Sequence, residues 1–295
     1  MPGGGALVAL AARGQRTDLV HGLHVAVPPG PTPAVVTIHD VVPLDHPASV
    51  PDPLRRLLYR RVLARALRRA GRVIVPSTLT RDRLVDHGVA PERLTVVPLG
   101  IGPRFRPLDG AEREQARRDF GGGGPYVAAS SAPRRHKNLM GMGAAAACLN
   151  PGVPVVLTGG RPQGAGTERL RFVGRLTDGQ LARFYGGAEL MVLPALVEGF
   201  GLPALEALAC GVPVVCGPQT GALDVLAPGA LVVDVTRPAE LAVAIDALLA
   251  DGDSRAQLAK SGRAAAEKLT AEAMADATLA VYREVLARRS DAATR

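Results

Sequence analysis

The chain has 295 residues, which favours two domains over one, and its hydrophobic content of 47% is sufficient for two cores. Aromatic residues make up only 3%, so these cores must be built from Ala, Val and Leu. Glycine and proline fall between the apolar runs and not in tracts, which argues against long disorder. The formal net charge of +8, concentrated in the first 120 residues, is compatible with a nucleic acid, an anionic lipid, a phosphorylated substrate or an arginine-rich solvent surface.

The cysteines, Cys148, Cys210 and Cys216, have neither metal-ligand nor redox spacing. Each lies in or beside an apolar run, so we expect buried free thiols, which are typical of the reducing cytoplasm. The apolar run Ala6–Ala12 is too short for an export signal or a membrane span. We therefore expect a cytoplasmic protein, with or without peripheral contact at the inner face of the membrane.

Nine short apolar runs are predicted to be buried strands, and most are followed by a stretch with helical spacing. This alternation predicts an α/β fold with parallel sheets and right-handed crossovers. The predicted strands are Leu19–His21, Val35–Ile38, Val73–Val75, Leu94–Val97, Tyr126–Ala129, Val155–Leu157, Leu190–Leu193, Val212–Val215 and Ala230–Val233.

The first strong helix is predicted at Leu54–Ala70, where leucines form an apolar stripe and arginines cover the rest. The ordinary interpretation is a surface helix of a soluble domain. The functional interpretation is that this basic helix, residues 54–72, lies on a membrane surface and is attracted to anionic lipid.

A linker is predicted at Pro98–Asp109, where glycines and prolines interrupt both periodicities. We accordingly place one domain at residues 1–108 and a second at residues 109–295. The last predicted helices, Arg255–Lys268 and Ala271–Arg288, have no strand between them, so we expect them to pack on the outside or to bridge the domains.

The loop that follows the predicted strand Leu190–Leu193 is a candidate binding site, because ligands of open α/β sheets bind at the carboxyl ends of strands. Glu198 lies in this loop, and Gly199 lets the backbone approach a ligand closely. The amides of Gly201 and Leu202 begin a helix and can bind anionic oxygens. Glu206 follows one turn later, and two ionised glutamates suit the vicinal hydroxyls of a ribose or a hexose. The alternative is a capped helix start with solvated glutamates.

The same segment, Gly199–Ala204, also matches the G-x-G-x-x-A fingerprint of dinucleotide-binding proteins, with Asp224 near the expected acidic position. The loop from Pro194 to Glu198 is longer than the tight turn that this fingerprint requires. Two glutamates beside it would also repel a pyrophosphate. We therefore disfavour a dehydrogenase.

Two further elements lie at predicted strand ends. Arg134, Arg135 and Lys137 follow the strand Tyr126–Ala129, where cations would face a diphosphate; an exposed basic loop is the alternative. His39 ends the strand Val35–Ile38, although a lone histidine is more often structural than catalytic.

The run Glu198–Val215 resembles the E-x7-E segment of retaining glycosyltransferases of the GT-B fold, family 4, which are relatives of bacterial mannosyltransferases and of glycosyl group 1 proteins. The resemblance implies that Glu198 contacts the transferred sugar and acts in catalysis. It implies that the segment from Gly199 through Phe200, Gly201 and Leu202 lines the donor. It also implies that Glu206 holds the donor ribose.

The segment Arg134–Leu139 resembles the basic loop of this family, whose Arg and Lys stabilise the leaving nucleoside diphosphate. Lys137 matches the lysine, and either Arg134 or Arg135 takes the place of the arginine, because Pro133 is displaced. The family's upstream Gly-Arg pair is replaced by Ser130-Ser131 here, so the phosphate clamp differs.

Two more segments carry the resemblance. The T-I-H-D sequence containing His39 resembles the acceptor-side loop, in which the histidine approaches the reacting centre. The segment Arg171–Asp178 resembles the loop that lines the donor base through backbone near Val173.

The resemblance implies two Rossmann-like domains with parallel sheets, the N-terminal one incomplete because the family's usual first strand and Gly-rich loop are not seen. The implied reaction moves a hexosyl group from a nucleoside diphosphate sugar to a hydroxyl acceptor such as a glycan or a lipid-linked sugar, with retention. The T-I-H-D type favours a mannosyl donor with GDP. The alternatives are a catalytically inactive donor-binding remnant and a sugar-nucleotide epimerase of similar fold.

We expect no cofactor besides the nucleoside diphosphate sugar as co-substrate, no required metal, and no nucleic acid partner. Asp251-Gly-Asp253 mimics the D-x-D metal site of the other glycosyltransferase fold, but it lies between two predicted helices. We therefore interpret it as a turn and a helix cap.

Overall fold

The computed structural model describes residues 17–132, 134–150, 152–160 and 169–293. The chain divides into two compact units. The first unit is Met1–Leu99 together with Glu272–Arg295, and the second unit is Gly100–Ala271. The run Ala6–Ala12 and Pro133 lie outside the described residues.

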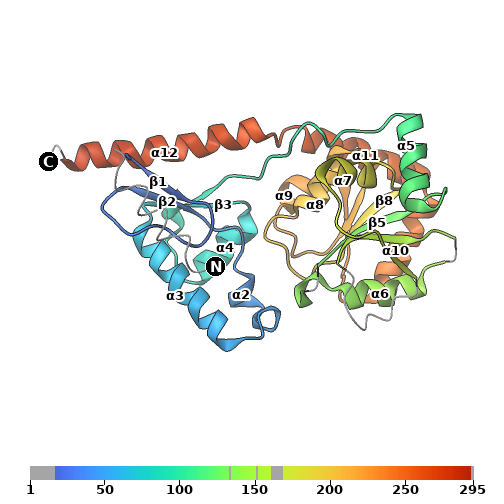
Figure 1. The fold of residues 1–295 in the computed structure, drawn as a ribbon, viewed down its shortest axis with the longest axis horizontal. Helices are drawn as coiled ribbons and strands as arrows, with labels where there is room; N and C mark the ends of the chain where they lie inside the picture. Colours follow the sequence, from blue (N-terminus) through green and yellow to red (C-terminus); the bar gives the residue numbers. More distant parts are fainter. Residues whose placement is uncertain (1–16, 133, 151, 161–168, 294–295) are drawn as a thin grey trace. The chain divides into compact units, whose positions relative to one another are not determined.

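The first unit is built on a parallel sheet with strand order β1-β2-β3-β4. Its helices form a layer on each face of the sheet (Figure 1). Alternate residues of the strands face opposite layers: Val36 and Val73 pack with α3 and α4, whereas Val35 and Ile74 pack with α12. The elements are β1 Val20–Gly22, β2 Ala34–Thr37, α2 Val42–Asp45, α3 Pro53–Arg69, β3 Arg72–Val75, α4 Thr78–Asp86, β4 Leu94–Val96 and α12 Ala271–Ala293.

The second unit contains a parallel sheet with strand order β10-β9-β8-β5-β6-β7. Helices α6 and α10 cover one face, where the main apolar cluster lies, and α7, α8 and α11 lie on the other (Figure 1). The strands are β5 Val127–Ser131, β6 Val155–Gly159, β7 Leu170–Phe172, β8 Leu190–Leu193, β9 Val214–Cys216 and β10 Ala230–Val232. The helices are α5 Gly110–Ala116, α6 Leu139–Cys148, α7 Asp178–Gly186, α8 Leu202–Ala209, α9 Leu223–Leu226, α10 Pro238–Ala250 and α11 Gly252–Ala266.

All nine predicted strands are present within two residues of their predicted positions. Strand β7 was missed, because the charged and exposed Arg171 lies between its two apolar residues, Leu170 and Phe172. A charged residue in the middle of three leaves no continuous apolar run in the sequence. The described first sheet has four strands and the second has six, in keeping with a smaller N-terminal domain.

The structural division falls at Leu99, whereas the predicted boundary was at residue 108. Residues 100–108 group with the second unit for two reasons. Ile101 forms a β-bridge with Thr270, and Leu108 packs so tightly on Gly186 that a Cβ there would lie 2.6 Å from its Cγ. Helix α12 groups with the first unit through the contacts of Val281 and Val285.

Cys210 and Cys216 are buried and free, as predicted. The prediction for Cys148 was wrong: it is the last residue of α6 and faces solvent.

Asp251 caps α11, and its side chain accepts a hydrogen bond from the Ser254 amide at 2.9 Å, which confirms that the D-x-D sequence is a helix cap. Among the described residues no helix is long and apolar enough to cross a membrane.

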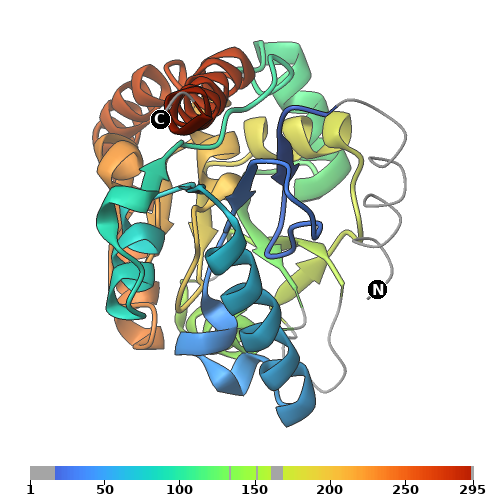
Figure 2. The ribbon, with the colours of Figure 1, turned by 90° about the vertical axis from the view of Figure 1, so that its left-hand side faces the viewer.

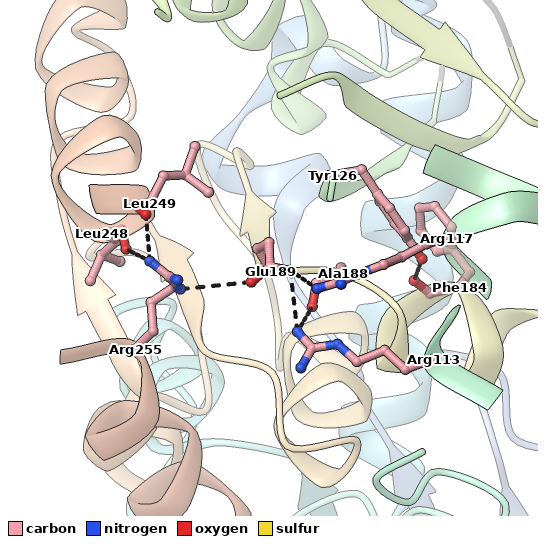
Figure 3. Close-up of polar contacts among 9 residues, drawn as sticks. All are labelled: Arg113, Arg117, Tyr126, Phe184, Ala188, Glu189, Leu248, Leu249 and Arg255. Carbon is pink, nitrogen blue, oxygen red and sulfur yellow. Dashed lines mark hydrogen bonds and ion pairs between the residues drawn. The ribbon is translucent and has the colours of Figure 1, made fainter. Parts of the chain in front are cut away.

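A polar cluster at the amino end of β8 joins three elements of the second unit (Figure 3). The Glu189 carboxylate, whose side chain is 14% exposed, forms ion pairs with Arg113 of α5, with Arg117 directly after α5, and with Arg255 of α11. The Arg255 guanidinium also donates to the Leu249 carbonyl at 2.6 Å. One carboxylate thus holds three arginines together at the amino end of this central strand.

We expect Glu189→Gln to lower the free energy of unfolding by about 2–4 kcal/mol, because three arginines would lose their common counter-charge. Urea unfolding followed by circular dichroism measures the change. Glu240→Gln is the matched control, since its exposed pair with Arg237 contributes at most about 0.5 kcal/mol. Equal stability of Glu189→Gln and wild type would show that the cluster does not support the fold.

Candidate functional site

The second sheet has a topological switch point between its central strands β5 and β8. The chain runs from β5 to β6 and β7 on one side, and then crosses to β8, β9 and β10 on the other. The loops that follow β5 and β8 therefore leave the sheet in opposite directions, and ligands of open α/β sheets bind in the crevice between such loops. These two loops carry Lys137 and Glu198.

Lys137 and Glu198 form an ion pair at this switch point. The Lys137 Nζ donates to Glu198 Oε2 at 2.5 Å, and the side chains are 23% and 17% exposed. The Leu196 amide donates to the His136 carbonyl at 2.8 Å, so the backbones of the two loops are joined as well. A charge-assisted hydrogen bond with little exposure to water stabilises this arrangement by roughly 1.5–3 kcal/mol.

Asn138 turns the chain from the lysine loop into α6. It has left-handed backbone geometry, with φ 51°, and its Nδ2 donates to the Val235 carbonyl at 2.8 Å. Asparagine is one of the few residues other than glycine that adopt this geometry readily. The position of Lys137 is therefore fixed by the residue that follows it.

The Glu198 backbone is held by the loop that follows β9. Its amide donates to the Gln219 carbonyl at 2.9 Å, and its carbonyl accepts from the Gly221 amide at 2.8 Å. The Phe200 carbonyl accepts from the Ala222 amide at 2.8 Å. Because the Phe200 side chain is only 4% exposed, it belongs to the core, and any ligand contact at this position is left to the backbone.

Gly201 allows the close approach of two loops at the start of α8. Its φ is 105°, in the left-handed region, and a Cβ there would lie 2.9 Å from Thr220 Cγ2. The residue is therefore required to be glycine. Leu202 is the first residue of α8, so its amide has no carbonyl partner within the helix, and the helix terminus carries a partial positive charge.

Glu206 lies on α8 and is 9% exposed. Burial, together with the nearby Asp178 carboxylate, raises the pKa of Glu206 to about 7. Burial therefore opposes the ionised form of Glu206, against the expectation that the helix start keeps both glutamates ionised. The cause is desolvation, because the side chain lies beyond the first turn, where the helix terminus has its effect.

A family model described as Glycosyl transferases group 1 matches residues 114–265, which is more than half of the chain. The chain belongs to this family. A second model, Glycosyltransferase Family 4, matches residues 2–105. The two matches correspond approximately to the second and first units.

Two relatives illustrate this membership. The D-inositol 3-phosphate glycosyltransferase of Acidothermus cellulolyticus is 33% identical over 89% of this chain and 64% of its own length. The MMP alpha-(1->4)-mannosyltransferase of Mycolicibacterium hassiacum is 31% identical over 87% of this chain and 66% of its own length. The chain thus spans about two thirds of the length of these relatives.

Solved structures agree on the fold. Sucrose-phosphate synthase from Thermosynechococcus elongatus superposes with a TM-score of 0.78 at 24% identity, over 96% of this chain and 77% of that one. HepE of Anabaena in complex with UDP-glucose superposes with a TM-score of 0.80 at 19% identity, over 95% and 82%. The fold of this member of the group 1 family is GT-B, with two Rossmann-like units.

Arg134 and Arg135 are exposed in the loop that leads to Lys137. Neither guanidinium forms an ion pair with a described residue. Val173 directly follows β7, and its amide donates to the Leu157 carbonyl at 2.9 Å. Because this amide is already hydrogen-bonded to β6, it is not available to the donor base. Contact between the base and the backbone of residues next to Val173 stays a prediction.

His39 lies in the first unit, two residues after β2, and is exposed. Its Nε2 donates to the Leu23 carbonyl at 3.1 Å. Sequence reasoning missed Asn138 and Thr220, which position the loops of Lys137 and Glu198 without carrying charge. The available signal for Thr220 was its place after the predicted strand Val212–Val215, at the same edge of the sheet as Glu198.

Proposed function

We propose that this chain transfers a hexosyl group from a nucleoside diphosphate sugar to a hydroxyl acceptor with retention of configuration. The observation that supports the proposal most strongly is the Lys137–Glu198 pair, which lies at the switch point of the sheet beside the start of α8. A cation for the diphosphate and a carboxylate for the sugar are thus within hydrogen-bond distance of each other. The family to which the chain belongs supports the same reaction class.

In this proposal the leaving diphosphate is stabilised by positive charge. Lys137, Arg134 or Arg135, and the amides at the start of α8 supply it, which is electrostatic catalysis by groups already in place. We propose that these groups make a metal ion unnecessary and that no cofactor is needed besides the nucleotide-sugar co-substrate. Glu198 orients the sugar and stabilises positive charge that develops on it.

The remaining roles follow from position. Glu206 would hold the donor ribose, and Gly199 would let the donor lie close to the backbone. His39 would approach the reacting centre from the acceptor side. The names of the mannosyltransferases of Mycolicibacterium hassiacum and Escherichia coli support a mannosyl donor, and we propose GDP-mannose as the first donor to test. A glycan or a lipid-linked sugar is the proposed acceptor.

The test is the release of nucleoside diphosphate from GDP-, UDP- and ADP-sugars with and without candidate acceptors. A transferase releases diphosphate in proportion to the acceptor added. A sugar-nucleotide epimerase converts the donor and releases none, and an inactive donor-binding remnant binds the donor without changing it. Either of the last two results would refute transfer by this chain.

We also propose that α3 contacts the cytoplasmic face of an anionic membrane. The helix contains no acidic residue and lies along the outside of the first unit, in blue in Figure 2. Its exposed stripe begins with leucines that are 73%, 45% and 52% exposed and continues with arginines. These residues are Leu54, Leu57, Leu58, Arg61, Arg65 and Arg68. Leucines can insert between lipids, and each arginine contributes about 1 kcal/mol beside anionic headgroups.

We expect the protein to sediment with phosphatidylglycerol-containing vesicles and not with pure phosphatidylcholine vesicles. The double variant Leu54→Ser, Leu58→Ser should lose most of this binding. Val243→Ser is the matched control, because this residue of α10 is 69% exposed and belongs to the second unit. Equal sedimentation with both lipids, or binding of the chain to duplex DNA in place of vesicles, would contradict the membrane contact.

A further inference from the structure

The first unit contains a cavity of about 560 Å³ at the carboxyl ends of its strands, closed on one side by α12. This volume lies within the range of small-molecule sites, roughly 300–1,000 Å³. His39 is one of the lining residues. The cavity lies within one unit, so its walls do not depend on the second unit.

The walls are mostly aliphatic. Leu23, at 72%, and Leu279, at 43%, are among the large apolar side chains that stay exposed in this structure. Apolar surface that remains in contact with water at the mouth of a cavity favours an apolar occupant. The aliphatic lining comes from Leu23, Ile74, Pro76, Val97, Leu99, Met274, Ala275 and Leu279.

The polar lining groups largely satisfy one another. His21 Nδ1 bonds to the Tyr282 hydroxyl at 2.6 Å, and its Nε2 bonds to Thr37 Oγ1 at 2.8 Å. The Thr278 hydroxyl donates to the Met274 carbonyl at 2.8 Å. Burial and, to a smaller extent, the neighbouring His39 lower the pKa of His21, which favours its neutral ring. The neutral ring accepts from only one of the Tyr282 and Thr37 hydroxyls, so the proton of the other hydroxyl stays available to a ligand oxygen.

His39 also has a polar atom that a ligand could contact. The Leu23 carbonyl can only accept, so Nε2 of His39 carries a proton. In the neutral ring Nδ1 then holds a lone pair, and no described residue donates to it. Among the described residues, His39 therefore offers a ligand one hydrogen-bond acceptor in a mainly aliphatic cavity.

We infer that this cavity binds an uncharged, mainly apolar alcohol whose hydroxyl group donates to His39. The aliphatic walls would hold its body, and its hydroxyl would donate to the lone pair of His39 Nδ1. If the chain transfers a sugar as proposed above, that hydroxyl is the acceptor of the sugar. Only this acceptor role, and not the binding itself, rests on the proposed function. The acceptor class is then an apolar alcohol and not a free sugar.

Ligand-observed NMR with three small probes tests the inference on the intact chain. Cyclohexanol has the expected chemistry, cyclohexyl methyl ether lacks the hydroxyl donor, and myo-inositol carries a hydroxyl on every ring carbon. We expect cyclohexanol to bind at least about tenfold more tightly than myo-inositol and several-fold more tightly than the ether. Tighter binding of myo-inositol would overturn the inference.

Two variants of α12 locate the site. Ala275 lines the cavity and is exposed, so Ala275→Phe should fill the space without disturbing the fold and weaken cyclohexanol binding at least about tenfold. Ala280 is exposed on the same helix outside the lining, so Ala280→Phe should bind as the wild type does. Equal binding by both variants would place the alcohol elsewhere and overturn the inference.

Titration with GDP and UDP separates this result from the proposed function, because the proposed nucleotide-binding residues belong to the second unit. Loss of nucleotide binding with intact cyclohexanol binding would refute the glycosyltransferase proposal and leave the cavity as a binding site. Intact nucleotide binding without cyclohexanol binding would refute the cavity as a binding site and leave the glycosyltransferase proposal standing.

Discussion

The Glu198→Gln variant is expected to bind a free nucleoside diphosphate about tenfold more tightly than the wild-type chain while transferring sugar about 100-fold more slowly. In the wild type the Lys137 ammonium is already paired with Glu198, so a diphosphate must compete with that carboxylate. Glutamine removes the competitor and leaves the cation for the phosphate. The same change removes the carboxylate that faces the sugar. Calorimetric titration with GDP or UDP and a transfer assay measure the two effects.

The opposite signs of these effects distinguish the proposed roles from simple damage to the fold. A structural defect would weaken nucleotide binding and lower transfer together. Glu240→Gln, which removes an exposed ion pair on α10, is the control and should change neither property. Weaker diphosphate binding by a folded Glu198→Gln variant would contradict the competition between Glu198 and the diphosphate for Lys137.

The Glu206→Gln variant is expected to be more stable than the wild type at pH 8 and to bind the donor about 10- to 100-fold more weakly. The pKa of Glu206 rises on folding from its ordinary value of 4.5 to about 7. The folded state therefore keeps the proton more strongly. The stability that this contributes is complete below pH 4.5 and is lost as the pH rises through 7. A change of this size corresponds to roughly 3 kcal/mol.

Urea unfolding of both proteins at pH 5 and pH 8 measures this effect. The advantage of the glutamine variant should be about 2–3 kcal/mol greater at pH 8 than at pH 5. Glu112→Gln supplies a contrast, because the hydrogen bond from Arg106 lowers the pKa of that exposed carboxyl. A pH-independent difference between Glu206→Gln and wild type would show that this carboxyl is not held in its protonated form.

The strands that the sequence indicates most clearly are those whose residues are all buried. All four residues of β2 are buried and so are those of β8, which gives continuous apolar runs that identify strands. Strand β7 has no such run. The assignment of α12 to the first unit depends on contacts of Val281 with Val35 and Ile74, which are far apart in the sequence. No local periodicity contains this information.

The candidate site, like the fold, could be predicted only in part from the sequence. Lys137 and Glu198 could be predicted singly, because each follows a buried strand and stands in a recognisable sequence segment. Their ion pair could not, since it depends on the bond between Leu196 and His136 that joins the two loops. The protonation of Glu206 could not be predicted either, because its burial arises from the packing of α8 against neighbouring elements.

Titration of the intact chain with GDP, UDP and ADP, repeated on Lys137→Met, tests the donor site most directly. The account predicts one nucleotide per chain in the wild type. It predicts that Lys137→Met binds the same nucleotide at least about tenfold more weakly, whereas Arg118→Met, which removes an exposed arginine of the same unit, binds as the wild type does. Unchanged nucleotide affinity in a folded Lys137→Met variant would contradict a donor site at the junction of β5 and β8.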